Sequence, residues 1–455
     1  MENKLPIGQK LTIEVQRLGI NGEGIGYHNR KAIFVDFALP KEEVEVEITA
    51  DFDTYYKANL VSIVKKSPSR VEPFCPVYHE CGGCQLQHLA YDETLKLKRE
   101  LIIQAIRRYV KTPVSLDLIK DTIPSEPNTH YRNKASLPLQ YKYGKNVIGM
   151  YKPNSNHLVE IKDCPVQEQD INKFYTLILN QMEKRKMLAY NNTSKTGTVR
   201  FIIIRRAAAT AEMQVTFILF KEDPEVVELA KYLVEKFKEI VSVYSVINDD
   251  LKSREFFTKN THLIAGKEAI NEVLNGVVFS LKPDAFFQLN TKQADVLYNK
   301  VIELGNFKKT DIVIDAYSGI APIAQYIAPH VKNVYAIESV QASYQSAKDT
   351  IIQNVNKNID LLKGDVVEVL NRNKNIPVDV IVFDPPRTGL GEKVTEFLLK
   401  KKPKKIIYIS CNPSTLAKDL DVLTQAYTIK SIEPLDMFPF TAHVESITLL
   451  SLKTA

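Results

Sequence analysis

The chain has 455 residues, of which 60 are Lys or Arg and 54 are Asp or Glu, so its formal net charge is only +6. This mild excess excludes a histone-like polycation, and 44% hydrophobic with 25% charged residues excludes long disordered or collagen-like sequence. At roughly 150 residues per domain, the length predicts about three domains. No apolar run reaches the ~18 residues of a membrane span, and the opening MENKLPIGQK lacks the apolar core of a secretory signal. We expect a soluble, cytoplasmic protein without membrane contact.

Residues 1–64 are predicted to form a small β-barrel. The runs LTIEV, KAIFVDFAL and EEVEVEI are strand-like, and in the last Val44, Val46 and Ile48 alternate with glutamates, the period of two of a half-buried strand. Residues 65–73, KKSPSRVEP, contain Pro and Ser that break both periodicities and are therefore predicted to be a linker.

Three alternating glycines, Gly22, Gly24 and Gly26, lie between the first two predicted strands. The pattern resembles a dinucleotide-binding loop, but such a loop is followed by a helix, whereas a strand follows here. We therefore assign these glycines to a turn that requires positive φ.

Residues 74–280 are predicted to form a central α+β domain that binds RNA. Residues 181–210 hold seven Lys or Arg against Glu183 alone, and 7 − 1 = +6 equals the excess of the whole chain. Residues 131–160 hold five cations against Glu160 alone: Arg132, Lys134, Lys142, Lys145 and Lys152. Cations neutralise phosphates, and tyrosines stack on bases; tyrosines are interleaved here at positions 131, 141, 143 and 151. A plain solvated face remains the alternative, and the barrel offers a second RNA-binding surface.

Four of the five cysteines are predicted to form one metal site, because three fall within ten residues in the spacing C-x5-C-x2-C and one follows in KDCPVQ: Cys75, Cys81, Cys84 and Cys164. Five cysteines are too few for a disulfide framework, whereas four thiolates complete a tetrahedral set. Gly82 and Gly83 let the backbone fold tightly around it. Spacing alone does not separate zinc from an iron–sulfur cluster. His79 and His88 are interpreted as surface or packing residues.

Residues 281–455 are predicted to form a doubly wound, parallel α/β domain, because short buried strands alternate with helix-length segments. Acidic residues close four of these strands: Asp315, Glu338, Asp365 and Asp384. A single one would be an ordinary helix cap, but a series at the carboxyl edge of a parallel sheet is typical of a nucleoside-cofactor site. A dinucleotide and S-adenosylmethionine both fit this pattern.

The fifth cysteine, Cys411, closes the strand in IIYISCNPSTL, so its thiol is expected at the ligand-binding edge near Asp384. A buried packing cysteine is the alternative. Near the end of the chain, Glu445 stands at the head of the apolar strand SITLLSL, where it is a possible proton acceptor.

At these residues the sequence resembles the RNA uracil-5-methyltransferase family along nearly the whole chain. The opening barrel resembles a TRAM domain, the cysteine spacing resembles the family's [4Fe-4S] site, and the catalytic motifs are similar to FFQLN, DPPRTGL, SCNPSTLAKDL and DMFPFTAHVE. The barrel and cysteines favour the RumA-like branch, which acts on 23S ribosomal RNA, over the tRNA branch, which resembles this chain only in its catalytic part. A monomer is expected.

The resemblance implies a role for each matching residue. It makes Cys411 the nucleophile and Glu445 the base, with Asp365 a weaker candidate near adenine, and it places four residues around S-adenosylmethionine: Gln288, Tyr317, Glu338 and Asp384. Carbon 5 of uracil is a poor nucleophile, so a thiolate first adds to carbon 6, after which carbon 5 attacks the methyl group. A base then removes the carbon 5 proton, and the thiolate leaves. The uridine must be unstacked for this attack.

The cofactor loop, DAYSGIAP, departs from the family's pattern. Ala321 replaces a residue that takes positive φ readily, and Pro322 removes an amide donor. If Ala321 adopts positive φ, the cost of about 1 kcal/mol predicts methyl-donor binding weakened several-fold. Two alternatives to rRNA methylation therefore stay open: tRNA methylation, and an RNA-binding ribosome-assembly protein that binds the donor poorly.

Overall fold

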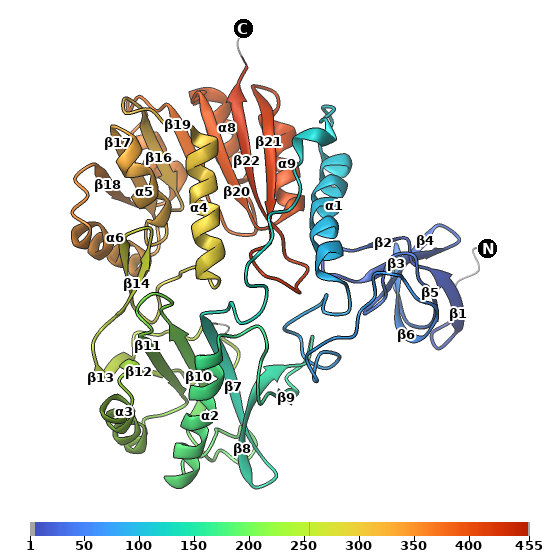
Figure 1. Cartoon of the computed structure of the whole chain (residues 1–455), viewed down its shortest axis with the longest axis vertical. Helices are drawn as coiled ribbons and strands as arrows, with labels where there is room; N and C mark the ends of the chain where they lie inside the picture. Colours follow the sequence, from blue (N-terminus) through green and yellow to red (C-terminus); the bar gives the residue numbers. More distant parts are fainter. Residues whose placement is uncertain (1–4, 254, 454–455) are drawn as a thin grey trace.

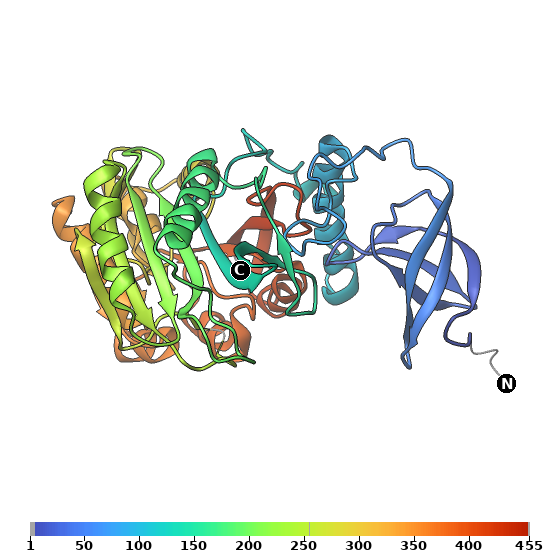
Figure 2. The same ribbon diagram turned by 90° about the horizontal axis from the view of Figure 1, so that it is seen from below.

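The computed structural model describes residues 5–253 and 255–453. The C-terminal domain and the central domain lie one above the other, and the N-terminal domain stands to one side of them (Figure 1). From below, the separation of the N-terminal domain is plain, and a helix with its neighbouring loops bridges the gap (Figure 2). No helix among the described residues is long and apolar enough to cross a membrane.

The N-terminal domain is a curled, six-stranded sheet, as predicted for this segment. Its strands, in spatial order, are β1 (Lys10–Glu14), β5 (Glu43–Asp51), β6 (Tyr55–Lys65), β4 (Lys31–Val35), β3 (Gly24–His28) and β2 (Arg17–Leu18). The alternation expected in β5 is confirmed, because Val44, Val46 and Ile48 are buried in the core of this domain.

The expectation for the three glycines is only partly correct. Gly22 has a φ of 93° and forms the turn, but Gly24 and Gly26 lie within β3. A Cβ on Gly24 would lie 2.7 Å from the carbonyl oxygen of Ala38, and one on Gly26 would lie 2.8 Å from that of Glu14. These two positions lack side chains because neighbouring backbone lies against them, rather than because φ is positive.

Helix α1 (Tyr91–Tyr109) lies within the range 74–280, yet it packs on the C-terminal domain. Ile102, Ile103 and Ile106 are buried in the same core as residues of the last helix, α9 (Pro413–Leu423). The short helix η1 (Leu116–Leu118) follows, and Ile119 forms a bridge to the last sheet. The range 74–280 is therefore not a single packing unit, because the apolar face of α1 is covered by a sheet from the far end of the chain.

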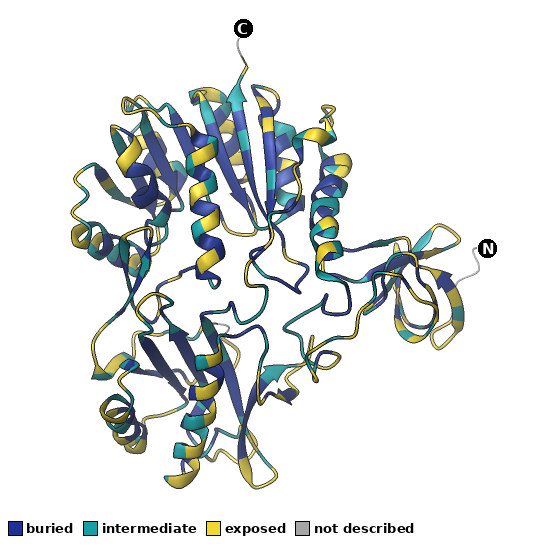
Figure 3. Cartoon of the chain, viewed as in Figure 1, coloured by how far each residue is buried: buried dark blue, intermediate teal, exposed yellow. Residues whose placement is uncertain are grey.

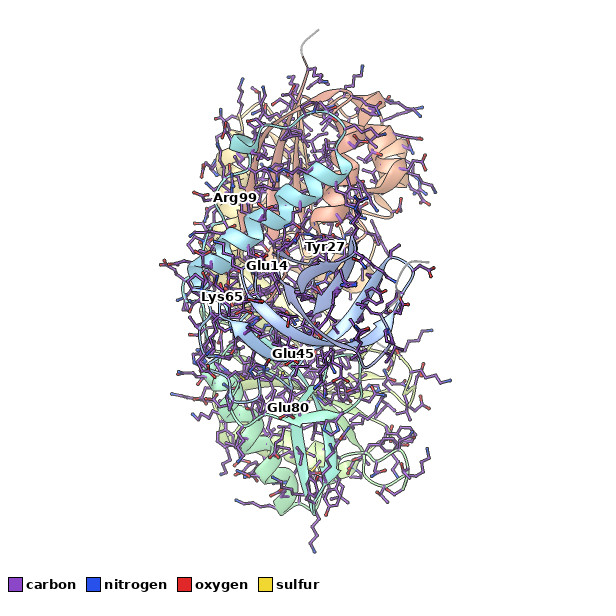
Figure 4. The ribbon with its side chains drawn as sticks, turned by 90° about the vertical axis from the view of Figure 1, so that its right-hand side faces the viewer. Glu14, Tyr27, Glu45, Lys65, Glu80 and Arg99 are labelled. Atoms are coloured by element: carbon purple, nitrogen blue, oxygen red, sulfur yellow. The ribbon has the colours of Figure 1, made fainter. Side chains whose placement is uncertain are left out.

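Figure 4 shows the side of the molecule on which the N-terminal domain faces α1: Arg99 projects from the helix, and Tyr27 lies on the nearby strands. Nη1 of Arg17 donates a hydrogen bond to Oε1 of Gln104 at 3.3 Å, and Leu97 of the helix packs against the apolar cluster that contains Leu18 and Leu39.

The central domain contains a seven-stranded sheet with helices on one face. Its strands, in spatial order, are β13 (Thr261–Gly266), β12 (Ile240–Ile247), β11 (Met213–Leu219), β10 (Val199–Arg206), β7 (Lys134–Lys142), β8 (Lys145–Tyr151) and β9 (Leu158–Glu160). Helices α2 (Gln169–Lys184) and α3 (Pro224–Lys236) cover the face that carries Ile202 and Ile204. The opposite face carries Ile203, packed with Phe201 and Phe256.

A hairpin, β14 (Ile270–Leu274) and β15 (Val277–Leu281), leads into the C-terminal sheet, whose order is β18-β17-β16-β19-β20-β22-β21. Its strands are β16 (Ile312–Ala316), β17 (Asn333–Glu338), β18 (Ile359–Lys363), β19 (Val380–Phe383), β20 (Lys405–Ser410), β21 (Tyr427–Leu435) and β22 (Glu445–Leu452). Strands β16, β17, β18, β19 and β20 are parallel to one another, as predicted, whereas β22 is antiparallel to both β20 and β21.

Helices cover both faces of this sheet, which is why its strands are buried almost throughout (Figure 3). One face packs against α4 (Thr291–Gly305), α5 (Pro322–Ile327), with the short η2 (Ala328–His330) after it, and α6 (Gln341–Gln353). The other packs against α1, α7 (Val366–Arg372), α8 (Gly391–Lys401) and α9. The doubly wound architecture is confirmed, and all strand-end loops that matter for the site meet at one edge.

Candidate active site

Cys411 lies at the carboxyl end of β20, directly before α9. Asn412 caps this helix, since its Oδ1 accepts a hydrogen bond from the Ser414 amide at 3.0 Å. The thiol is partly exposed. It thus lies at the open edge of the sheet and beside the positive end of a helix dipole, a position that favours a reactive thiolate.

Glu445 reaches the same edge because β22 runs antiparallel to β20. Ser446 pairs with Ser410 in this ladder, so the head of β22 lies beside the end of β20. The carboxyl group is buried, and this burial, together with the nearby Asp384, raises its pKa to about 8. A carboxyl group with a pKa near the working pH is well suited to take up a proton.

The environment of Cys411 is acidic. Burial, with the carboxyl groups of Glu445 and Asp384 nearby, raises the pKa of the thiol to about 11, and the Arg387 guanidinium acts in the opposite direction. The ligand-free protein therefore holds a thiol at neutral pH. Positive charge added at this edge would favour the thiolate.

Two further carboxyl groups make the edge receptive to a cation. Burial raises the pKa of Asp384 to about 7 and that of Asp315 to about 8. Asp315 accepts a hydrogen bond from the Ala324 amide through Oδ2, while its Oδ1 is buried with no hydrogen-bond partner among the described residues. Buried carboxyl groups of this kind suit a ligand with an ammonium or sulfonium group, because its positive charge offsets the free-energy cost of their desolvation.

Glu338 ties the end of β17 to the loop after β16. Its Oε2 accepts a hydrogen bond from the Gly319 amide at 2.8 Å, and its Oε1 accepts one from the Val340 amide at 2.6 Å. Tyr317, in the same loop, is half-buried and has a φ of 64°. The loop and the carboxylate therefore lie side by side at the position expected of a nucleoside site.

Ala321 and Pro322 are the two residues of the cofactor loop that depart from the family's pattern. Ala321 has a φ of 65°, in the left-handed region. Pro322 is the first residue of α5, where a helix has no use for the missing amide and where φ is already suited to a helix. The left-handed conformation of Ala321 costs about 1 kcal/mol relative to glycine at the same position.

The structure gives two further predicted residues the following contacts. Asp365 caps α7, because its Oδ1 accepts hydrogen bonds from the amides of Val367 and Glu368. Gln288 precedes α4 and is largely buried, and its main-chain oxygen accepts a hydrogen bond from Asn133 at 2.9 Å.

Arg387 and His443 also line the small pocket that contains Cys411, although the sequence analysis assigned them no role. The guanidinium lies 3.2 Å from the imidazole, whose pKa is lowered to about 4 by burial and by this cation. Both residues belong to motifs quoted above, DPPRTGL and DMFPFTAHVE, so inspecting the charged members of those motifs would have found them.

A buried ion pair supports the loop before Glu445. Nζ of Lys98, on α1, contacts Oδ1 of Asp436 at 2.5 Å, and neither side chain is exposed. Lys98 also donates to the Phe438 carbonyl at 3.1 Å, and its charge acts to lower the pKa of Glu445. Nothing in the local sequence distinguishes this lysine, because its partner lies 338 positions away.

The four remaining cysteines, Cys75, Cys81, Cys84 and Cys164, line one cavity together with Arg132. Burial raises the pKa of the Cys84 thiol to about 12, and those of Cys81 and Cys164 are raised for the same reason. Over residues 5–253 and 255–453, no three His, Cys, Asp or Glu side chains are arranged to hold a metal ion as they stand. His88 is fully buried against Tyr78, which agrees with a packing role.

Several residues expected to bind RNA are occupied within the fold. Tyr131 is buried and donates to the Pro439 carbonyl. Arg205 is buried and donates to the carbonyl groups of Lys282 and Ala285, and Arg206 pairs with acidic groups at 2.8 Å. The prediction that all these cations and rings face RNA is wrong for these three, because local charge does not reveal which side chains bond internally.

A doubly wound sheet with a thiol and several carboxyl groups at its carboxyl edge is compatible with the class of S-adenosylmethionine-dependent methyltransferases. A crystal structure of the Pyrococcus abyssi tRNA (uracil-54, C5)-methyltransferase in complex with S-adenosyl-L-homocysteine matches with a TM-score of 0.77 and 27% identity, covering 96% of this chain and 99% of that one. Residues 90–453 match the model of the tRNA (uracil-5-)-methyltransferase family, and residues 4–61 match the TRAM domain. The chain therefore belongs to the S-adenosylmethionine-dependent uracil-5 RNA methyltransferase family.

Relatives similar over their whole length occur in other bacteria. A protein of Bacillus anthracis is 38% identical over 456 residues, covering 99% of both chains, and one of Streptococcus agalactiae is 37% identical over 451 residues, covering 98% of both. Both are named uncharacterized RNA methyltransferases. The expectation that tRNA enzymes resemble this chain only in its catalytic part is wrong, since the Pyrococcus abyssi enzyme matches it almost throughout.

Proposed function

We propose that this protein transfers a methyl group from S-adenosylmethionine to carbon 5 of a uridine in 23S ribosomal RNA, in the cytoplasm. The observation that carries the proposal is the antiparallel pairing of β20 and β22, which brings the Cys411 thiol and the Glu445 carboxyl group to one edge of the sheet. A thiol and a buried carboxyl group at the same ligand-binding edge can act on one substrate as nucleophile and proton acceptor.

In this proposal the chain's own residues carry out addition and elimination. Cys411 adds as thiolate to carbon 6 of the uracil, which makes carbon 5 nucleophilic. After methyl transfer, Glu445 accepts the proton from carbon 5, and the sulfur leaves by elimination. Arg387 offsets the surrounding negative charge and so favours the thiolate.

S-adenosylmethionine supplies an electrophilic methyl group when it is bound. Glu338, Tyr317, Gln288 and Asp384 are the residues proposed to hold it, with the carboxylate of Glu338 accepting hydrogen bonds from ribose hydroxyls. The unpaired, buried oxygen of Asp315 and the raised pKa values of the neighbouring carboxyl groups fit a cationic ligand. Asp365 is not assigned to the donor site, because its carboxylate caps helix α7.

A [4Fe-4S] cluster held by Cys75, Cys81, Cys84 and Cys164 is also proposed. Four thiols around a single cavity are the donor set that such clusters use, and the guanidinium of Arg132, whose Nε is buried without a partner among the described residues, suits an anionic group. A structural or RNA-positioning role follows, since methyl transfer requires no electrons. Absorbance near 400 nm in anaerobically purified protein supports iron–sulfur, and colourless protein with stoichiometric zinc contradicts it.

A second candidate substrate is tRNA, which the match to the Pyrococcus abyssi enzyme favours. Mapping 5-methyluridine by mass spectrometry in 23S rRNA and tRNA from a deletion strain separates the two. Loss from 23S rRNA that is restored by the native chain, and not by Cys411→Ala, supports the proposal. Loss of 5-methyluridine confined to tRNA shows that tRNA is the substrate and leaves the proposed chemistry unchanged. Restoration of 5-methyluridine by Cys411→Ala overturns the mechanism. The remaining alternative, an assembly protein, requires that calorimetry detect no donor binding.

A further inference from the structure

The open face of the central sheet carries a groove of about 840 Å³ that the proposed chemistry does not use. Strands β7, β8 and β10 contribute its floor, and segments 190–192 and 251–253 form its sides. Pockets of roughly 300–1,000 Å³ are the size that encloses a drug-sized ligand, so a base with its sugar fits here. We call it the central groove, and its principal residues are Gln140, Tyr141, Lys142, Tyr151, Tyr190, Asn191, Asn192, Arg200, Phe201 and Lys252.

The charge of the central groove suits a polyanion. Lys142, Arg200 and Lys252 line it, and among the residues that the structure describes no Asp or Glu does. Arg200 is held in place because its Nη1 donates to the main-chain oxygen of Asn248. Burial lowers the pKa of Arg200. Asp249 and Asp250 lie near Arg200 without lining the groove, and their negative charge acts to raise that pKa.

Aromatic rings in the groove offer faces on which bases can stack. Tyr151 and Phe201 line the groove and are half-buried. Tyr190 is fixed by stacking on Phe220, with ring centroids 4.0 Å apart and planes inclined by 10°. Its hydroxyl is buried without a hydrogen-bond partner among the described residues, although it belongs to the groove lining. Side-chain amides of Gln140, Asn191 and Asn192 add donors and acceptors for base edges.

We propose that the central groove binds single-stranded RNA that flanks the target uridine. Stacking on aromatic rings requires exposed base faces, which a duplex hides, and cations beside the rings neutralise the backbone. The inference rests on the proposed function for its choice of RNA, but it concerns a site separate from Cys411. It narrows the substrate to RNA that has an unpaired segment in addition to the methylated residue.

Binding of a fluorescent oligoadenylate of about ten nucleotides to the full-length protein tests the proposal. This probe lacks uracil, so the catalytic chemistry and its failure do not affect the result. We expect Tyr151→Ala to weaken binding about tenfold and Lys142→Gln to lower the slope of log affinity against log salt by about 0.7. Native protein that binds a duplex of the same length equally well overturns the preference for single strands.

Matched control variants lie on the same hairpin. Tyr143 is 97% exposed at the turn between β7 and β8 and does not line the groove, and Lys145 pairs with Glu160 outside it. Tyr143→Ala and Lys145→Gln are expected to bind the probe as native protein does. Equal loss in both sets of variants shows a diffuse electrostatic surface and contradicts the groove. Melting temperatures equal to the native value exclude unfolding as the cause.

Discussion

The carboxyl edge of the C-terminal sheet and the central groove have opposite electrostatics. At the edge, Asp315, Asp384 and Glu445 all have pKa values raised by burial, whereas the groove is lined by cations and open aromatic rings. The edge is therefore only partly ionised near neutral pH and favours a positively charged ligand, while the groove attracts a polyanion from solution. Under the proposed function, chemistry and RNA affinity reside in separate parts of the molecule, and substitutions in one should leave the other intact.

The largest effect is expected from Glu445→Gln. Loss of a positioned base typically slows proton transfer by about 10²–10⁴-fold, and here it leaves the thiolate unable to depart. We expect an RNA–protein adduct that survives a denaturing gel, with binding to oligoadenylate unchanged. Glu433→Gln, on the neighbouring strand β21, is the control and should turn over normally. A Glu445→Gln protein that makes 5-methyluridine at the native rate refutes the assignment.

Arg205→Met separates structural cations from those that meet RNA. Arg205 donates to two carbonyl oxygens from a site that is 4% exposed, at 3.0 Å and 2.6 Å. Its loss leaves the Ala285 carbonyl without this partner, while the Lys282 carbonyl keeps the Ala285 amide at 3.1 Å, so we expect the free energy of unfolding to fall by about 2 kcal/mol. The measurement is chemical denaturation, with Lys184→Met on the exposed end of α2 as the control. Equal stability of the two variants contradicts a structural role.

The pH dependence of the release step should report Glu445. Burial raises its pKa to about 8, so the carboxylate that accepts the proton is the minor form at pH 7 and the major form at pH 9. Below pH 8 the rate of adduct breakdown is expected to rise about tenfold per pH unit and to level off above it. Quench measurements on preformed adduct give this rate directly. A rate that does not change between pH 6 and pH 8 excludes Glu445 as the base in that step.

Chain order made the carboxyl edge predictable. Asp384 and Cys411 follow neighbouring parallel strands, so their proximity follows once the strands are recognised. Glu445 required the additional fact that β22 is antiparallel, since a parallel strand would have placed it at the opposite edge. The buried position of Lys98 could not be predicted from the sequence, because it depends on α1 packing against the last sheet, far away in the chain.

In the central domain, composition indicated a basic region but not which cations stay available. Arg205 and Lys142 occur in similarly basic sequence, yet one is bonded inside the fold and the other lines a groove. The difference depends on the face of the sheet and on distant carbonyl groups, and neither follows from local charge.

Ala321→Gly is expected to have the smallest effect, and it tests whether the loop is formed before the donor binds. Glycine relieves left-handed strain of about 1–2 kcal/mol, but it also adds about 0.4–1 kcal/mol of unfolded-chain entropy and removes a buried methyl group worth about 0.8 kcal/mol. If the loop holds its φ of 65° before the donor binds, these contributions act on folding, where they nearly cancel.

Calorimetric affinity for S-adenosylmethionine should therefore stay within about twofold of the native value in Ala321→Gly. Gly319→Ala is the matched control: Gly319 has a φ of 57° and open space around its missing Cβ, so this change adds strain of about 1 kcal/mol without a clash. It should lower the melting temperature while Ala321→Gly leaves it nearly unchanged. Several-fold tighter donor binding by Ala321→Gly shows instead that the loop adopts its left-handed turn only when the donor binds. In that case Ala321 lowers the affinity of the active site for S-adenosylmethionine.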